Sequence, residues 1–143
     1  MTPIDILLVE DNPGDARLTR EALASSTVQN RLHHVQDGED ALAFLKHAGR
    51  FDSAPTPDLV LLDLNLPRRH GREVLEDIKG DPSLAHIPVV VLTSSEAEED
   101  VLKSYRLHAN CFITKPADLD ELTRVVKGIE QFWFTLVKLP PGI

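Results

Sequence analysis

Short apolar runs alternate along the chain with segments in which apolar residues recur at helical spacing. The apolar runs predict five strands, at residues 4–10, 30–35, 59–63, 88–92 and 111–114. Helical segments lie between these strands and after the last one. Such an alternation is typical of a parallel sheet covered by helices on both faces. We therefore expect an α/β fold with a doubly wound, five-stranded parallel sheet.

Turn and capping residues mark the predicted helices. Residues 12–15 (Asn-Pro-Gly-Asp) open the first, Asp37 and Gly38 precede the second, and Gly71 precedes the third. The inward stripes of these helices are predicted to be Leu18, Ala22, Leu23, Ala41, Leu42, Leu45, Val74, Leu75 and Ile78. Val101, Leu102 and Tyr105 mark a fourth helix, and the last runs from about Leu119 until Pro140 and Pro141. Residues 49–58, with two prolines, read as an exposed loop.

Length and charge narrow the class of protein. A chain of 143 residues suits one domain with a real core. The formal net charge of -8 argues against a nucleic-acid partner, and the basic cluster at residues 68–70 reads as a solvated loop. No apolar stretch approaches the length of a membrane helix, and the single cysteine, Cys111, rules out an internal disulfide, so we expect a cytoplasmic protein. The six histidines lack ligand spacing and read as ordinary surface or partly buried residues.

Polar residues with useful chemistry stand at the carboxyl ends of four predicted strands. They are Glu10 and Asp11 after the first strand, Asp63 at the third, Thr93 after the fourth and Lys115 after the fifth. In an open parallel sheet these ends share one edge, and ligands bind outside it. Three acids, a hydroxyl and an amine are therefore expected to meet in space.

The expected group of acids calls for a compensating cation. Two carboxylates about 4 Å apart repel by roughly 4 kcal/mol at an effective dielectric of 20. All-oxygen ligands favour Mg²⁺, which commonly bridges a carboxylate to a phosphate. An ionised Asp63 is a competent nucleophile toward phosphorus, with Lys115 and Thr93 placed to hold the phosphoryl oxygens. No general base is evident, so slow hydrolysis and a stored phosphoryl signal are expected.

These residues resemble the receiver domains of two-component response regulators. The likeness covers residues 4 to about 130. It rests on Gly71 and on four short motifs, at residues 6–12 (ILLVEDN), 61–67 (LLDLNLP), 90–93 (VVLT) and 114–116 (TKP). It implies the flavodoxin-like receiver fold with strand order 2-1-3-4-5. It also implies one receiver domain over residues 1–143, with an extended C-terminal helix, a short tail and no output domain.

The resemblance assigns a role to each matching position. Asp63 corresponds to the phosphoacceptor, Asp11 to a direct metal ligand, and Glu10 to the acid that reaches the metal through water; many members have Asp at this last position. Asn65 would offer its backbone carbonyl to Mg²⁺, for which Mn²⁺ would substitute. Thr93 corresponds to the switch hydroxyl and Lys115 to the phosphate-binding lysine. Pro116 corresponds to the proline that follows a cis peptide bond, and Phe112 to the switch aromatic.

A narrower resemblance, to stand-alone regulators associated with cyanobacterial and bacterial phytochromes, rests on phrases without chemistry of their own. They lie at residues 12–15, 104–105, 110–113, 132–133 and 139–140. This likeness implies that the partner is a sensor histidine kinase of the bacterial phytochrome type. The family also implies a homodimer through the face of the fourth helix, fifth strand and fifth helix. Its candidate contacts are Tyr105, Phe134 and Leu139. Of these, Phe134 and Leu139 fall off the inward stripe of the last helix and are therefore available to a partner.

The favoured function is therefore a phosphoacceptor signalling protein rather than an enzyme, one that contributes to its own phosphorylation and dephosphorylation. Open alternatives are a phosphorelay intermediate and a receiver-like module that binds partners without phosphorylation. A nucleotide or flavin module would need a glycine-rich or hydroxyl-rich loop where Glu10, Asp11 and Asn12 stand. An aspartyl-phosphate hydrolase would need a second acid where Asn65 stands.

Overall fold

The computed structural model describes residues 3–25, 29–93, 111–114 and 119–131. Its strands are β1 (Ile4–Val9), β2 (Asn30–Val35), β3 (Leu59–Leu62), β4 (Val89–Thr93) and β5 (Cys111–Thr114). Its helices are α1 (Pro13–Ala24), α2 (Gly38–Leu45), the 3-10 turn η1 (Gly49–Phe51), α3 (Gly71–Gly80) and α5 (Leu119–Gln131). Each predicted strand is present, and its bounds agree with the prediction to within one residue.

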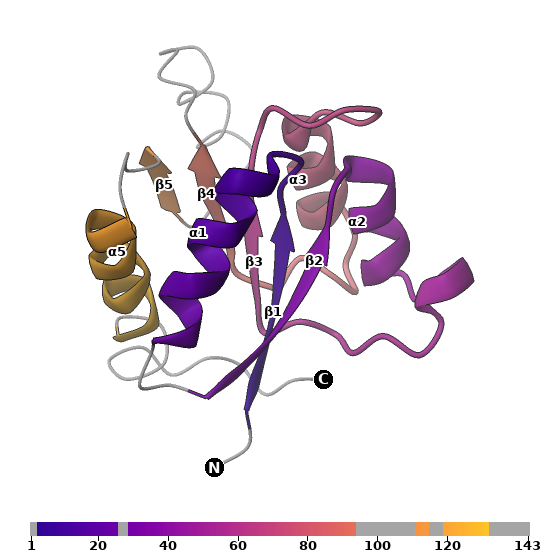
Figure 1. The fold of residues 1–143 in the computed structure, drawn as a ribbon. Coiled ribbons are helices and arrows are strands. Elements are labelled where there is room, and N and C mark those ends of the chain that lie inside the picture. The colour runs from indigo at the N-terminus through magenta and orange to yellow at the C-terminus, as the bar shows by residue number, and fades with distance from the viewer. Residues whose placement is uncertain (1–2, 26–28, 94–110, 115–118, 132–143) are drawn as a thin grey trace.

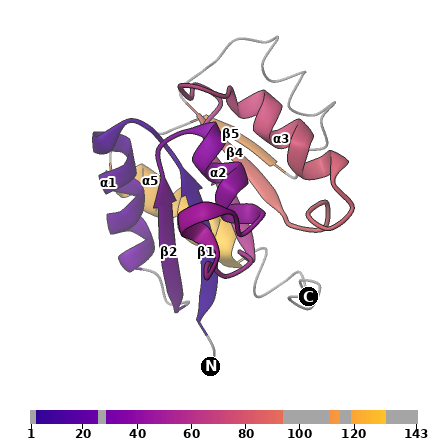
Figure 2. The ribbon, with the colours of Figure 1, turned by 90° about the vertical axis from the view of Figure 1, so that its right-hand side faces the viewer.

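The strands form one parallel sheet in the order β2-β1-β3-β4-β5, which confirms the predicted topology. Figure 1 shows the strands pointing the same way, with α1 and α5 on one face, and Figure 2 shows α2 and α3 on the other. Because β1 and β3 are central neighbours, their carboxyl ends lie side by side. Register pairs Val9 with Leu62, the last residues of these two strands.

Side-chain alternation along the strands supplies two hydrophobic cores. Leu7, Val9, Val60 and Leu62 face α2 and α3, whereas the intervening residues Ile6, Leu8, Leu59 and Leu61 face α1 and α5. The central strands are thus apolar on both faces, as expected for a parallel sheet covered twice. Burial of these side chains fixes the register, because a slip of one residue would exchange the two faces.

The helix caps follow the sequence prediction closely. The side chain of Asn12 accepts a hydrogen bond from the Asp15 amide at the start of α1, and Asp37 does the same for the Asp40 amide at α2. Both residues thereby satisfy an amide that has no partner within its helix. The predicted stripe of α3, which is Val74, Leu75 and Ile78, is fully buried.

Two expectations about the α2 region are wrong. Phe44, which was not predicted to face inward, is buried, and Leu42 is only partly buried. Residues 49–58 are not simply an exposed loop, because they begin with η1 and Phe51 packs on Phe44 with ring centroids 5.5 Å apart. The two prolines of this segment predict a loop, but the apolar ring of Phe51 is packed against Phe44 and is thereby partly buried.

Candidate functional site

The site is built where β1 and β3 end. The Asp63 amide donates to the Val9 carbonyl over 3.1 Å, and the Glu10 amide donates to the Val35 carbonyl over 3.0 Å. These bonds extend the sheet pairing one step past the strands. Asp63 and Glu10 are consequently held at the same edge by backbone contacts on both sides of β1.

Three carboxylates converge at this edge. One oxygen each from Glu10, Asp11 and Asp63 lies within 4.8 Å of the others. Glu10 and Asp63 are buried, at 2% and 5% exposure, whereas Asp11 is exposed. The predicted meeting of these three acids is thus present, and it combines two shielded carboxylates with one open to solvent.

Backbone amides partly compensate the buried negative charges. The Asn65 amide donates to Asp63 Oδ1 over 3.0 Å, and the Asn12 amide donates to Glu10 Oε2 over 3.3 Å. These bonds orient the carboxylates but leave the repulsion among three acids, which is a few kcal/mol per pair, roughly 3–4 at an effective dielectric of 20. The donor set is entirely hard oxygen, which fits a divalent cation such as Mg²⁺ or Mn²⁺.

The loop after Asp63 is packed tightly against the start of α3. The Gly71 amide donates to the Leu64 carbonyl over 3.0 Å. A Cβ atom on Gly71 would overlap the Asp63 carbonyl oxygen and the Leu64 Cα atom. A glycine is therefore required here so that α3 can approach the backbone of the central acid.

The same loop is attached to α2. Arg68 has a left-handed backbone with φ of 65°, and its guanidinium lies 3.5 Å from Asp37 and 3.6 Å from Glu39. A Cβ atom on Gly38 would overlap the Arg69 carbonyl oxygen. The basic cluster at residues 68–70 is thus more than a solvated loop, since Arg69 also pairs with Asp77 and His70 caps α3.

The other predicted site residues are placed only in part. Thr93 is the last residue of β4, at the same sheet edge, and Phe112 lies in β5, paired in register with Val91. Lys115 and Pro116 lie outside the described residues, as do the interface candidates Tyr105, Phe134 and Leu139. Their assigned roles stay predictions.

Two residues near the site were missed by the sequence reasoning. His34 Nε2 lies 2.7 Å from the Glu10 carbonyl oxygen, and Gly38 makes the close approach to Arg69 described above. No spacing pattern in the sequence predicts such a contact for a histidine or a glycine. Each contact is made with a segment more than twenty residues away in sequence, so the fold had to be known first.

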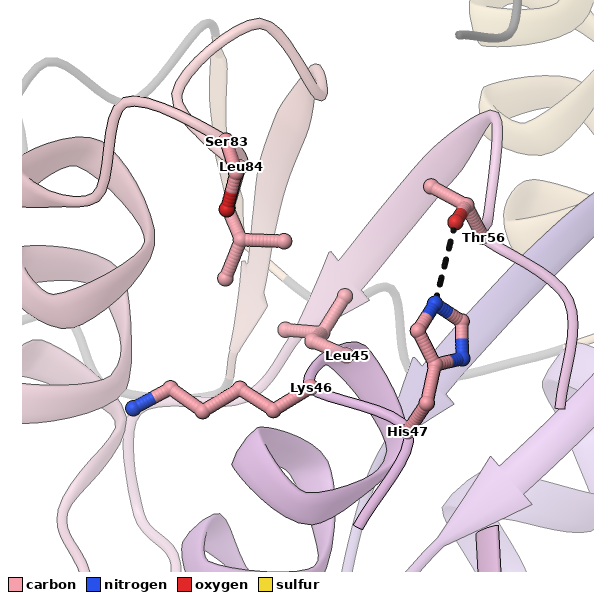
Figure 3. A pocket seen from close by; sticks show the side chains of 6 residues that line it. All are labelled: Leu45, Lys46, His47, Thr56, Ser83 and Leu84. Carbon is pink, nitrogen blue, oxygen red and sulfur yellow. Dashed lines mark hydrogen bonds between the residues drawn. The ribbon is translucent and has the colours of Figure 1, made fainter. Parts of the chain in front are cut away.

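A separate cavity of about 380 Å³ lies at the opposite end of the sheet. It is lined by residues at the end of α2 and by residues that precede β3 and β4. Figure 3 shows His47 turned toward Thr56, with their side chains 3.3 Å apart, while Lys46 extends away from them. The lining contains none of the three acids. The acidic cluster is therefore separate from this cavity.

The comparisons with known proteins agree with this arrangement. Residues 6–127 match the family model of the response regulator receiver domain, so the chain belongs to that family. The chain is therefore a two-component signalling protein, and a protein of this family has a histidine kinase as its partner. No helix within the described residues is long and apolar enough to cross a membrane.

Among individual relatives, the chain is 51% identical to response regulator Rcp1 of Synechocystis over 96% of its own length and 94% of that protein. It is 41% identical to the probable methanogenesis regulatory protein FilR2 of Methanothrix harundinacea, with 92% and 84% of the two chains covered. The solved structure of the phosphorylated cyanobacterial phytochrome response regulator RcpA is 53% identical and superimposes with a TM-score of 0.92, covering 97% of this chain and 99% of that one. The Mn²⁺-bound form of Rcp1 gives a TM-score of 0.90 at 51% identity, with 96% and 99% covered.

Proposed function

We propose that Asp63 accepts a phosphoryl group from a phosphohistidine of a sensor histidine kinase in a reaction that requires Mg²⁺. The observation that carries this proposal is the convergence of Glu10, Asp11 and Asp63, with carboxylate oxygens within 4.8 Å, at the carboxyl edge of a parallel sheet. Asp11 and Asp63 would bind the cation directly, Glu10 through water, and Asn65 through its backbone carbonyl. The cation supplies positive charge that balances the acids and the phosphoryl oxygens.

In the proposed step an Asp63 carboxylate oxygen attacks phosphorus while the nitrogen–phosphorus bond of the phosphohistidine breaks. The leaving imidazole nitrogen keeps the bonding electron pair, and an acyl phosphate forms on Asp63. Lys115 pairs with the phosphoryl oxygens, and Thr93 donates a hydrogen bond to one of them. By these contacts the chain contributes to its own phosphorylation and, with a bound water, to its dephosphorylation.

Phosphorylation is proposed to act by a shift between conformations. Attraction of Thr93 and Lys115 to the phosphoryl group closes the neighbouring loops, and Phe112 turns inward as in the family. Amide spectra recorded before and after phosphorylation test this step. Unchanged signals from Phe112 and its neighbours in the phosphorylated protein would contradict it.

We further propose that the kinase is of the phytochrome type and that the protein acts in the cytoplasm without binding nucleic acid. The similarity to RcpA, described as a phytochrome response regulator, supports the kinase class. We also propose a homodimer through the fourth helix, β5 and α5, with Tyr105, Phe134 and Leu139 as contacts. Sedimentation as a monomer at every concentration would contradict the dimer.

A single receiver domain over residues 1–143 and a role as a phosphorelay intermediate both remain compatible with this proposal. A receiver-like module that works without phosphorylation is disfavoured, because such a module has no need to hold three acids together against their repulsion. The hydrolase alternative is disfavoured because the chain carries Asn65 in place of a second acid.

Incubation with acetyl phosphate and Mg²⁺, followed by intact mass measurement, tests the central step. We expect the wild type to gain one phosphoryl group and Asp63→Asn to gain none. The matched control is Asp52→Asn, an exposed aspartate remote from the cluster, which is expected to behave as wild type. Equal gain by wild type and Asp63→Asn would contradict the assignment of the acceptor.

A further inference from the structure

We propose that His34 is a positioning residue that fixes the peptide between Glu10 and Asp11 and thereby aims Asp11 at the divalent cation. The inference rests on the metal site proposed above, and it assigns a role to a side chain outside the acidic cluster. His34 belongs to β2, next to β1 in the sheet.

The contact itself is short and has a defined direction. His34 Nε2 lies 2.7 Å from the Glu10 carbonyl oxygen. A carbonyl oxygen only accepts hydrogen bonds, so Nε2 carries the hydrogen and donates it. The half-buried position of His34 protects this bond from competition by water.

This bond completes the attachment of Glu10 to β2. The Glu10 amide already donates to the Val35 carbonyl over 3.0 Å, which fixes the peptide that precedes Glu10. The Glu10 carbonyl belongs to the next peptide, which leads to Asp11. β2 thus holds the backbone on both sides of Glu10, once through its own backbone and once through the His34 ring.

Asp11 depends on this attachment more than its two neighbours do. Glu10 and Asp63 are buried, and each accepts a backbone amide bond that orients its carboxylate. Asp11 is exposed and has no side-chain hydrogen bond or ion pair to any residue in the described ranges. The backbone therefore sets the position of the Asp11 Cβ atom, and with it the region that the Asp11 carboxylate can reach.

The backbone of Asp11 has anchors on either side. Asn12 follows it and caps α1 by accepting a hydrogen bond from the Asp15 amide over 3.1 Å. On the preceding side the anchor is the His34 bond to the Glu10 carbonyl. Loss of that bond frees the peptide to rotate, and the Asp11 oxygen moves away from the other two acids.

The test is a Mn²⁺ titration of the full chain followed by the electron paramagnetic resonance signal of free Mn²⁺. Removal of the donor in His34→Leu is expected to weaken binding about tenfold, the lower end of the effect of outer-shell partners on metal affinity. His34→Gln keeps an amide donor of similar reach and is expected to restore affinity to within about threefold of wild type. His34→Asn, whose amide is too short to reach, is expected to match His34→Leu and replaces it if that variant does not fold.

The matched control is His33→Leu on the same strand. His33 contacts Asp5 over 3.0 Å and the Phe44 ring, away from the acidic cluster. This variant is expected to lower the unfolding temperature of the metal-free protein while leaving Mn²⁺ affinity unchanged. If His34 only stabilised the fold, His34→Leu would likewise lower the unfolding temperature and leave the Mn²⁺ affinity unchanged.

The outcomes separate the two proposals. Wild-type Mn²⁺ affinity in both His34→Leu and His34→Asn would overturn the positioning role alone and leave the metal site standing. Failure of the wild type to bind Mn²⁺ would overturn the metal site and this inference with it. Weak binding by His34→Leu and His34→Asn, restored in His34→Gln, would support the inference.

Discussion

Charged side chains at the two ends of β1 are balanced in different ways. At the carboxyl end, Glu10, Asp11 and Asp63 stand together and call for a cation. Near the amino end, Asp5 is 8% exposed and is paired within the protein. Arg31 donates to both Asp5 oxygens over 2.9 and 3.1 Å, and His33 Nε2 lies 3.0 Å from Oδ1. The second group is thus internally neutralised, whereas the first is suited to a ligand.

The pairing of Asp5 makes stability depend on pH. Burial raises the pKa of Asp5, but the hydrogen bonds from His33 and Arg31 outweigh it and hold the pKa below its ordinary value. A carboxyl with a lowered pKa in the folded state stabilises the protein above its ordinary pKa of about 3.9. The contribution is lost as the pH falls below that value and the folded carboxylate takes up a proton.

Asp5→Asn is therefore expected to lower the free energy of unfolding by about 1–2 kcal/mol near neutral pH, a range that allows for the solvent exposure of Arg31. The difference from wild type should be smaller at about pH 3, because below the ordinary pKa of an aspartate the unfolded chain takes up a proton at Asp5 more readily than the folded protein does. Urea denaturation at the two pH values measures it. Asp52→Asn, which alters an exposed aspartate, should stay within about 0.5 kcal/mol of wild type. A deficit that does not shrink in acid would refute the electrostatic explanation.

The acids of the candidate site could be predicted from the sequence, but the Asp5 group could not. Asp11 and Asp63 follow apolar runs, and parallel topology makes strand ends meet. Asp5 instead lies inside the apolar run at residues 4–9, so the sequence predicted only that it belongs to a strand. Its partners come from β2, and only the register, which pairs Asp5 with Arg31, brings them together.

The start of α3 packs closely against the loop that follows Asp63. The sequence predicted a helix starting near Gly71, because a glycine stands before an apolar stripe. It did not predict that the Asp63 carbonyl would lie against Gly71, since that contact depends on how α3 packs on the sheet. The stripe of α3 and the loop after Asp63 together leave no room for a side chain at this position.

Gly71→Ala is expected to destabilise the fold by about 1–3 kcal/mol, because the added methyl group must displace backbone atoms. It should also slow phosphoryl acceptance, since the displaced atoms include the Asp63 carbonyl. Gly80→Ala is the matched change at the other end of α3, where a Cβ would meet no heavy atom within 4 Å. That variant should be as stable as wild type or more stable by up to about 1 kcal/mol.

Urea denaturation and the acetyl phosphate reaction measure both effects. Equal stability of the two alanine variants would show that α3 adjusts freely, and the tight packing at Gly71 would then have no consequence.

At the scale of the whole molecule, the packing of the sheet positions the acidic site. Two buried cores hold β1 and β3 in register, and this register places Glu10 and Asp63 side by side. The parallel sheet, the helix caps and the acidic edge were predictable from periodicity, capping residues and strand-end chemistry, whereas the order of the strands was predicted from the family resemblance. The His34 contact was not, because it joins residues whose proximity comes only from the pairing of β1 with β2.

We propose that the three acids hold a divalent cation and that this cation lets Asp63 accept a phosphoryl group. The most direct measurement is the initial rate of phosphorylation by acetyl phosphate as a function of Mg²⁺ concentration. We expect the wild-type rate to saturate with Mg²⁺, and Asp11→Asn to need at least about tenfold more Mg²⁺ for half its maximal rate. Glu21→Gln removes the same charge from the exposed side of α1 and should follow the wild type. A wild-type rate independent of Mg²⁺, or an Asp11→Asn curve that coincides with wild type, would contradict a cation held by these acids.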